Sequence, residues 1–252
     1  MSILRRAKYF TENVFDKTLG RFLFQFMEKK DGLFNWHYNC LIRQHVTGFK
    51  DFSPHYHYYE FGVASGYSIE NYIFALKKFC KDYNFDINKF HIHGFDSFEG
   101  LPDREGVSDA HPTWSKGEMK WEERVVREKV RALGFPLANL HLYKGYYEQI
   151  LTPELRDGLK DSSPALINID CDYYSSTITA MNWMAPMLKS GAIFRFDDYW
   201  AFHGNPEYGE IRAINEFNNS GIGYLTSFPI LGLDTFSYIY SRKVFEYDNK
   251  QS

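Results

Sequence analysis

Two short acidic strings in the sequence have the composition of a cation site. Asp170 and Asp172 are separated by one cysteine, and Asp197 is followed directly by Asp198. Four carboxylates held close together repel one another unless some are protonated or a cation neutralises them. Because the ligands would be oxygen atoms only, the strings predict a hard divalent cation, Mg²⁺ or Ca²⁺. The alternative is that some of these acids cap helices or form ion pairs with basic neighbours.

A glycine turn and one further acid indicate a nucleoside ligand. Gly62 and Gly66 bracket a turn that lets the backbone approach a ligand closely. The turn lacks the Gly-x-Gly-x-x-Gly spacing, so a pyrophosphate is poorly supported. Asp96 ends the next strand-like segment, where doubly wound folds hold the two ribose hydroxyls. This combination suits S-adenosylmethionine, and the alternative is a tight turn that binds nothing.

The elements that must position these residues alternate between strand and helix patterns. Helical periodicity follows most of the strand-like segments, with Ser68 and the string Asn205-Pro206-Glu207 expected to cap two of the helices. This alternation predicts an α/β fold, a doubly wound, mostly parallel seven-stranded sheet with an antiparallel C-terminal strand pair. The strands are expected at residues 57–63, 90–96, 140–143, 164–170, 192–197, about 224–230 and 235–240.

The acids and the glycine turn then fall on one edge of the sheet. Ligands of such sheets bind beyond the carboxyl ends of the strands, near the switch in strand order. Side chains at positions i and i+2 of a strand share a face, so Asp170 and Asp172 are expected to point into one site. Residues 1–50 are expected to form an N-terminal helical extension or lid, and 51–252 the main domain. The polar stretch 103–120 is too long for an ordinary connection and predicts a lid.

Composition excludes several classes of protein. The chain has 252 residues, a net charge of −3 with histidine neutral, and 44% hydrophobic residues. This balance argues against a nucleic-acid binder, which needs a basic face, and no stretch is apolar enough to span a bilayer. The three cysteines share no metal-ligand spacing, and no signal peptide is legible. We expect a soluble, cytoplasmic protein with reduced cysteines. The sequence is compatible with a homo-oligomer as well as with a monomer.

Four strings of the sequence resemble the macrocin O-methyltransferase (TylF-like) family. The similarity runs in the family's order from about Tyr58 to Phe217, and the string that begins at Asp96 is the most distinctive. The strings are Glu60-Phe61-Gly62-Val63-Ala64-Ser65-Gly66, Asp96-Ser97-Phe98-Glu99-Gly100-Leu101-Pro102, Ile169-Asp170-Cys171-Asp172-Tyr173-Tyr174-Ser175-Ser176-Thr177 and Phe196-Asp197-Asp198-Tyr199.

The resemblance implies a class I methyltransferase with a Rossmann-like fold that uses S-adenosylmethionine and Mg²⁺ to methylate sugar hydroxyls of glycosylated natural products. It implies that Asp170, Asp197 and Asp198 are the metal ligands, as in the similar site of catechol O-methyltransferases, and that Asp172 is the general base. The implied cofactor-binding residues are Glu60, Gly62, Gly66, Asp96, Ser97, Gly145 and Tyr146.

Three positions depart from the family pattern. Ser175 stands where the family has Glu, and Ser190-Gly191 replaces a pair of glycines. Arg195 interrupts a strand that is normally apolar and shares a strand face with Asp197, two residues later. We therefore expect Arg195 to pair with an acid of the site, which would reduce the number of carboxylates available to a metal.

Two rival functions remain at this stage. A glycosyltransferase also uses an Asp-x-Asp string, with a metal and a nucleotide-sugar, and a non-catalytic domain could keep the fold and bind a partner only. The glycine turn followed by Asp96 favours the methyltransferase. His55, His57, His91 and His93 alternate along two strand-like segments, and we interpret them as edge or hydrogen-bonded core histidines rather than metal ligands.

Overall fold

The computed structural model describes residues 32–47, 56–228 and 236–244. The strands are β1 (His57–Phe61), β2 (His91–Asp96), β3 (Leu140–Lys144), β4 (Pro164–Ile169), β5 (Ile193–Phe196), β6 (Gly223–Ser227) and β7 (Phe236–Arg242). They form one seven-stranded sheet in the order β3-β2-β1-β4-β5-β7-β6. The first five strands are parallel, and β7 runs antiparallel to both β5 and β6. The predicted doubly wound sheet with an antiparallel C-terminal pair is therefore confirmed.

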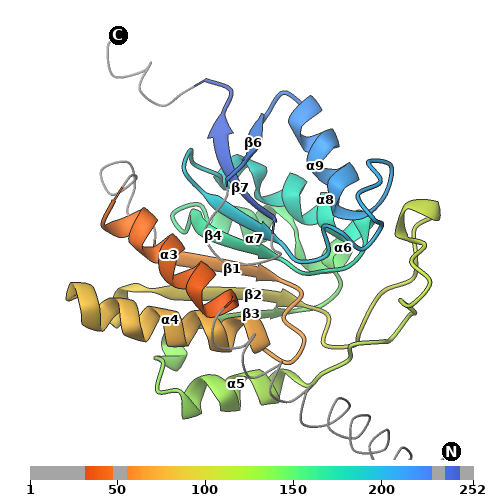
Figure 1. The fold of residues 1–252 in the computed structure, drawn as a ribbon. Coiled ribbons are helices and arrows are strands. Elements are labelled where there is room, and N and C mark those ends of the chain that lie inside the picture. The colour runs from red at the N-terminus through yellow and green to blue at the C-terminus, as the bar shows by residue number, and fades with distance from the viewer. Residues whose placement is uncertain (1–31, 48–55, 229–235, 245–252) are drawn as a thin grey trace, which may run out of the picture.

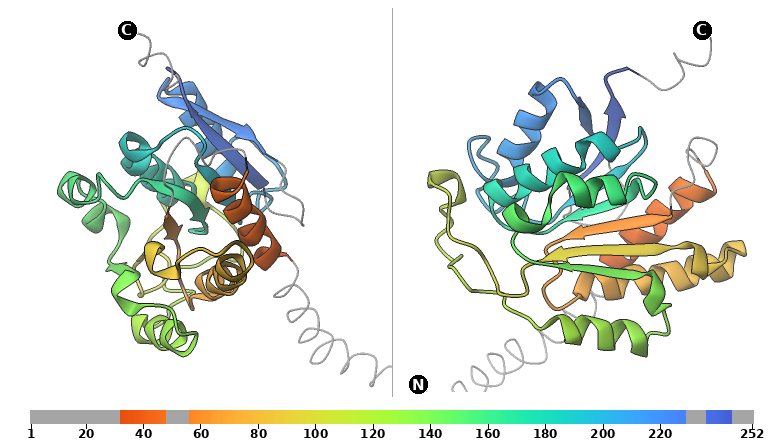
Figure 2. Two further views of the ribbon diagram at one scale, coloured as in Figure 1. Left: turned by 90° about the vertical axis from the view of Figure 1, so that its left-hand side faces the viewer. Right: turned by 180° about the vertical axis from the view of Figure 1, so that it is seen from behind.

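Helices cover both faces of the sheet (Figures 1 and 2). One face carries α3 (Leu33–His45), α4 (Tyr67–Tyr83) and α5 (Glu123–Ala132), and the other carries α6 (Tyr147–Ile150), α7 (Pro153–Gly158), α8 (Tyr174–Met184) and α9 (Gly209–Asn219). Short 3₁₀ turns occupy Ile87–Lys89, Val107–Asp109, Leu137–Asn139 and Ala185–Met187. No described helix is long and apolar enough to cross a membrane.

Strand alternation divides the core into two apolar clusters. Phe194 and Phe196 of β5 pack in the cluster beneath α8 and α9, whereas Ile193 packs in the cluster beneath α3 and α4. Because successive residues of a strand point to opposite faces, Arg195 lies on the same face as Ile193. This alternation places the charged side chain of Arg195 on the face that α3 covers, near the carboxyl edge of the sheet.

The helix α3 is fixed to the sheet by polar contacts at both of its ends. Near its start, the indole Nε1 of Trp36 donates a 2.6 Å hydrogen bond to Oγ of Ser237 in β7. Near its end, Nε2 of Gln44 donates to the carbonyl oxygen of Gly191 at 2.7 Å. Residues 1–31 of the predicted N-terminal extension lie outside the described residues.

Two helices begin at residues other than those predicted. The helix α4 begins at Tyr67 after Gly66, which adopts a left-handed conformation, so Ser68 lies in the first turn and does not cap the helix. The helix α9 begins at Gly209 rather than after Asn205. Oδ1 of Asn205 instead accepts a hydrogen bond from the backbone nitrogen of Glu207, which closes a local Asx turn before the helix.

Four histidines gather at the start of β1, β2 and β3, away from the carboxyl edge. Nδ1 of His57 lies 3.0 Å from Nε2 of His93, and Nδ1 of His91 lies 3.3 Å from Nε2 of His141. His93 also lies within 3.2 Å of the Tyr143 hydroxyl. The interpretation of the histidines as hydrogen-bonded strand residues is confirmed for 57, 91 and 93, and His55 lies outside the described residues.

These histidines predict a loss of stability in mild acid. Burial, followed by the neighbouring His91 and His141, lowers the pKa of His57 to about 4, and burial lowers the pKa of His93 well below its usual value. In the unfolded chain both titrate near pH 6.5. Their contribution to the free energy of unfolding is therefore complete above pH 6.5 and is lost as the pH falls towards 4.

The measurement is urea denaturation of the wild type and His57→Gln at several pH values between 7.5 and 4. Buried carboxyls elsewhere shift the curve in the opposite direction, but both proteins share them, so they cancel in the difference. We expect the wild type to lose more stability than His57→Gln across this range. Parallel curves for the two proteins would contradict the prediction.

Candidate functional site

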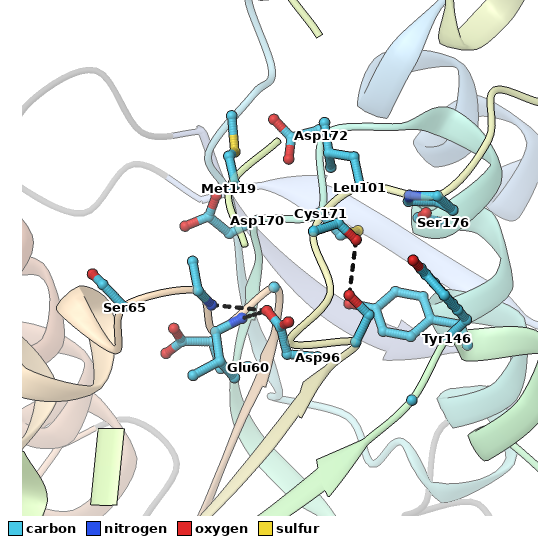
Figure 3. Close-up of a pocket in the computed structure, with 18 of the residues that line it drawn as sticks. Glu60, Ser65, Asp96, Leu101, Met119, Tyr146, Asp170, Cys171, Asp172 and Ser176 are labelled. Carbon is cyan, nitrogen blue, oxygen red and sulfur yellow. Dashed lines mark hydrogen bonds between the residues drawn. The ribbon is translucent and has the colours of Figure 1, made fainter. Parts of the chain in front are cut away.

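A cavity opens at the carboxyl ends of β1, β2, β3 and β4 and brings most of the predicted site residues together (Figure 3). Those in its lining are Glu60, Gly62, Asp96, Ser97, Gly145, Tyr146, Asp170 and Asp172. Gly66, Asp197 and Asp198 are not part of the lining. Gly66 shapes the start of α4 instead, and the two aspartates follow β5.

The carboxylate of Asp96 fastens the glycine turn to the end of β2. Its Oδ2 accepts hydrogen bonds from the backbone nitrogens of Val63 at 2.7 Å and Ala64 at 2.8 Å, and Figure 3 shows both as dashed lines. Its Oδ1 accepts from the backbone nitrogen of Phe98 at 2.6 Å. A carboxylate has about four acceptor positions, so acceptor capacity remains for a ligand hydroxyl. The sequence did not reveal this structural role.

Gly62 is required by a close approach between two strand ends. It has φ +90°, and a Cβ added there would lie 1.6 Å from the carbonyl oxygen of Asp170. The backbone nitrogen of Asp170 donates to the carbonyl of Phe61 at 2.8 Å, which holds β4 against β1 at this point. The glycine therefore positions Asp170 beside the turn, at the switch in strand order.

Glu60 is a buried carboxyl at the base of the cavity. It is 1% exposed, and its Oε2 accepts a 2.6 Å hydrogen bond from the Tyr58 hydroxyl. Burial raises the pKa of Glu60 to about 8, although the hydroxyl of Tyr58 and the charge of Arg195 act in the opposite direction. Burial therefore favours the protonated form of this carboxyl.

Asp170 and Asp172 both line the cavity, but strand alternation is not the reason. The strand β4 ends at Ile169, and Asp172 adopts φ +62°, a left-handed conformation that is uncommon for aspartate. The turn after the strand therefore directs the two carboxylates, which the sequence had assigned to one strand face. Cys171 between them packs in the apolar cluster beneath α8 and also reaches the cavity lining.

Burial and mutual repulsion raise the pKa values of Asp170, Asp172 and Asp198. The pKa of Asp172 rises to about 8 and that of Asp198 to about 7, and the pKa of Asp170 lies well above its usual value. In each case burial contributes most, followed by a neighbouring aspartate of the group. The acids therefore lie close enough to interact strongly and lack sufficient positive charge nearby.

The described residues contain no group of three or more His, Cys, Asp or Glu side chains arranged to hold a metal ion. One reason is that one of the predicted metal ligands, Asp197, already has a positively charged partner. The guanidinium of Arg195, which is 6% exposed, forms an ion pair with Asp197 through Nη2. The expectation that Arg195 pairs with an acid of the site is confirmed. By contrast, Oδ2 of Asp198 is buried with no hydrogen-bond partner among the described residues.

The segment 103–120 lies beside the carboxyl edge and is fastened there by a buried aspartate. Oδ1 and Oδ2 of Asp109 accept hydrogen bonds from the backbone nitrogen and the hydroxyl of Ser175, at 3.0 and 2.7 Å. Trp114 packs on Tyr173, and Met119 lines the cavity. The sequence did not identify Asp109. The feature that could have pointed to it is Ser175, its partner, which stands where the family has glutamate.

A family model for macrocin-O-methyltransferases (TylF) matches residues 73–222, more than half of the chain. This interval contains Asp96, the segment 103–120, both acidic strings and all of α9, whereas the glycine turn lies just before it. No curated protein matches the sequence.

Solved structures of methyltransferases share the fold. The calicheamicin methyltransferase CalS11 is 22% identical with a TM-score of 0.62, and the match covers 80% of this chain and 76% of that one. The O-methyltransferase NovP is 16% identical with a TM-score of 0.59, covering 82% and 78%. An apo structure of CalS11, described as a TDP-rhamnose 3'-O-methyltransferase, is 21% identical with a TM-score of 0.52, covering 80% and 76%.

The contact between Asp109 and Ser175 predicts thermodynamic coupling across 66 residues of sequence. We expect Asp109→Asn and Ser175→Ala each to destabilise the protein by about 1–2 kcal/mol, because the first replaces an acceptor oxygen of a buried side chain by a donor and the second removes one of that side chain's hydrogen bonds. The double variant should be less destabilised than the sum of the two by about 1 kcal/mol.

Urea denaturation of the four proteins measures this coupling. Thr113→Ala in the same segment is the control, because the Thr113 hydroxyl contacts only His111 two residues away. Combining Thr113→Ala with Ser175→Ala should give additive effects. Strict additivity for the Asp109 and Ser175 pair would show that their contact does not fasten the segment.

Proposed function

The chain belongs to the macrocin-O-methyltransferase (TylF) family, and from this membership we propose that it transfers the methyl group of S-adenosylmethionine to a hydroxyl of a sugar or of a glycosylated small molecule. We propose further that a divalent cation, Mg²⁺ or a similar ion, assists the transfer. The observation that carries the proposal is one cavity that brings the glycine turn and Asp96 together with Asp170 and Asp172.

The cofactor end of the cavity has the features that an adenosyl ligand requires. The turn from Gly62 lines the cavity, and Asp96 keeps acceptor capacity for ribose hydroxyls. Ser97, Gly145 and Tyr146 extend the lining along the same edge. The buried carboxyl of Glu60 also lines the cavity, where it can receive a polar group of the cofactor.

The acceptor class follows from the family rather than from the fold. Macrocin methyltransfer is an O-methylation, and CalS11 is described as a TDP-rhamnose 3'-O-methyltransferase. At this level of identity the solved structures support the fold alone, so the sugar acceptor is a proposal for this chain. The family match leaves the metal-dependent glycosyltransferase without support.

We assign the general base to Asp172. The reaction needs an acceptor oxygen that has lost its proton and lies in line with the sulfonium methyl group. Asp172 lines the cavity, is 6% exposed and extends from the turn next to Asp170. Its carboxylate can take the acceptor proton, and the segment that carries Leu101 and Met119 excludes water from this part of the cavity.

The acids after β4 and β5 have the donor chemistry of a hard cation. Asp170, Asp197 and Asp198 would hold it through carboxylate oxygens. The buried, unpartnered Oδ2 of Asp198 and the raised pKa of Asp170 support this proposal, because the charge of Arg195 offsets the repulsion among these carboxyls only in part. Bound there, the cation would lower the pKa of the acceptor hydroxyl and orient it. Asp197 would then contact both the cation and the guanidinium of Arg195.

The function is tested by methyl transfer from labelled S-adenosylmethionine to a panel of nucleoside-diphosphate sugars and glycosylated small molecules. For Asp172→Asn we expect turnover to fall by about 10²- to 10⁴-fold, because a positioned base contributes that much. Its affinity for S-adenosylhomocysteine, measured by calorimetry, should stay within about threefold of the wild type, because Asn keeps the shape of the side chain.

Asp96→Asn is the matched control on the cofactor side. It should weaken S-adenosylhomocysteine binding, because an amide offers fewer acceptor positions to the backbone nitrogens of the glycine turn. Unchanged turnover in Asp172→Asn would remove the base role. A wild-type protein that binds S-adenosylhomocysteine but methylates none of the sugar acceptors would contradict the proposed acceptor class.

A further inference from the structure

Arg195 is a buried cation held by two neighbouring elements. It lies in β5 with 6% exposure, and its Nη1 donates a 2.6 Å hydrogen bond to Oδ1 of Asn168 in β4. Its Nη2 forms the ion pair with Asp197, and Nε has no hydrogen-bond partner among the described residues. A guanidinium held in this way cannot move out to solvent without breaking both contacts.

Acids from four elements surround this guanidinium. The charge of Arg195 acts on Glu60 of β1, on Asp170 after β4, on Asp198 after β5 and on Glu210 at the start of α9, and it lowers the pKa of each. Tyr58 of β1 and His37 of α3 also lie within range of its charge. Arg195 therefore provides positive charge to these four acids, in addition to Asp197.

Glu210 shows that this charge does not satisfy the cluster. It is 1% exposed, and neither of its carboxyl oxygens has a hydrogen-bond partner among the described residues. Like Oδ2 of Asp198, these atoms are buried acceptors that face an excess of acids. The guanidinium of Arg195 thus offsets only part of the negative charge of this cluster, which can still accept a further cation.

We propose that Arg195 is a built-in counter-cation of this acidic site, which shares Asp197 with the divalent cation and thereby lowers the affinity of the site for that cation. The inference rests on the cation in the proposed function. Two like charges on one carboxylate repel each other. The Asp197 side chain is 40% exposed but that of Arg195 is only 7% exposed, so water screens this repulsion only in part. Because Asn168 holds the guanidinium, it remains near the cation rather than withdrawing.

The proposal makes Arg195 a positioning residue with two opposite effects. Without the divalent cation it stabilises the acids and so the folded edge of the sheet. With the cation bound it opposes binding. Replacing Arg195 by a neutral side chain should therefore destabilise the metal-free protein and tighten cation binding, whereas a residue with a purely structural role would not increase the affinity for a cation.

The experiment is titration of the full chain with Mn²⁺, in the presence of saturating S-adenosylhomocysteine, followed by electron paramagnetic resonance of the free ion. We expect Arg195→Met to bind Mn²⁺ more tightly than the wild type, on the order of tenfold, because a nearby like charge is removed. Arg195→Lys, which keeps the charge, should stay closer to the wild type.

Arg242→Met is the matched control, because Arg242 is a partly buried arginine that donates to the carbonyl of Leu188. It should bind Mn²⁺ as the wild type does. If Arg195→Met fails to fold, Arg195→Gln, which can keep a hydrogen bond to Asn168, replaces it with the same expected tightening.

The outcomes separate this inference from the proposed function. If the wild type binds Mn²⁺ and the neutral Arg195 variants bind it equally or more weakly, the inference is overturned while the cation site stands. If neither the wild type nor the variants bind Mn²⁺, and methyl transfer continues in EDTA, both the inference and the proposed cation are overturned, while the methyltransferase function remains.

Discussion

The burial of several carboxyl groups at one edge of a parallel sheet is the constraint on which the site depends. Such groups are costly to ionise away from water, so each must be hydrogen-bonded, paired or protonated. The protein stabilises each of these carboxyl groups in a different way. Backbone amides bind Asp96, a tyrosine hydroxyl binds Glu60, and the buried guanidinium of Arg195 pairs with the more exposed Asp197. At Asp170, Asp172 and Asp198, burial and mutual repulsion raise the pKa instead.

Two strand ends also approach each other closely at this edge. Gly62 leaves no space for a side chain beside the carbonyl of Asp170, so the glycine turn and the first acidic string are in direct contact. This contact brings the proposed methyl donor next to the proposed base and cation ligands. A change at either strand end would therefore disturb both parts of the reaction together.

Much of the fold could be predicted from the sequence, because alternation and helical periodicity are local signals. The sheet, its antiparallel pair and the acids at the strand ends follow from them, whereas Ser97, Gly145 and Tyr146 of the cavity lining were predicted from the resemblance to the family. The pairing of Arg195 with Asp197 was also predictable, because residues two apart on a strand share a face. These inferences all rest on residues that lie close together in the chain.

The remaining features depend on contacts that no local pattern encodes. Asp109 meets Ser175 across 66 residues, and the amides that bind Asp96 come from a turn more than thirty residues earlier. Asp172 reaches the cavity through a left-handed turn, which the string Asp-Cys-Asp does not indicate. In each case the arrangement depends on how loops meet at the carboxyl edge of the sheet. Sequence periodicity carries no information on these loop contacts.

The central claim is that Asp170, Asp197 and Asp198 hold one cation beside a bound adenosyl group. Anomalous X-ray diffraction from crystals grown with Mn²⁺ and S-adenosylhomocysteine tests it most directly. The account predicts a single manganese peak within ligand distance of these carboxylates, with the sulfur of S-adenosylhomocysteine in the adjoining cavity above Asp96. Manganese bound elsewhere, or an adenosyl group outside this cavity, would contradict it.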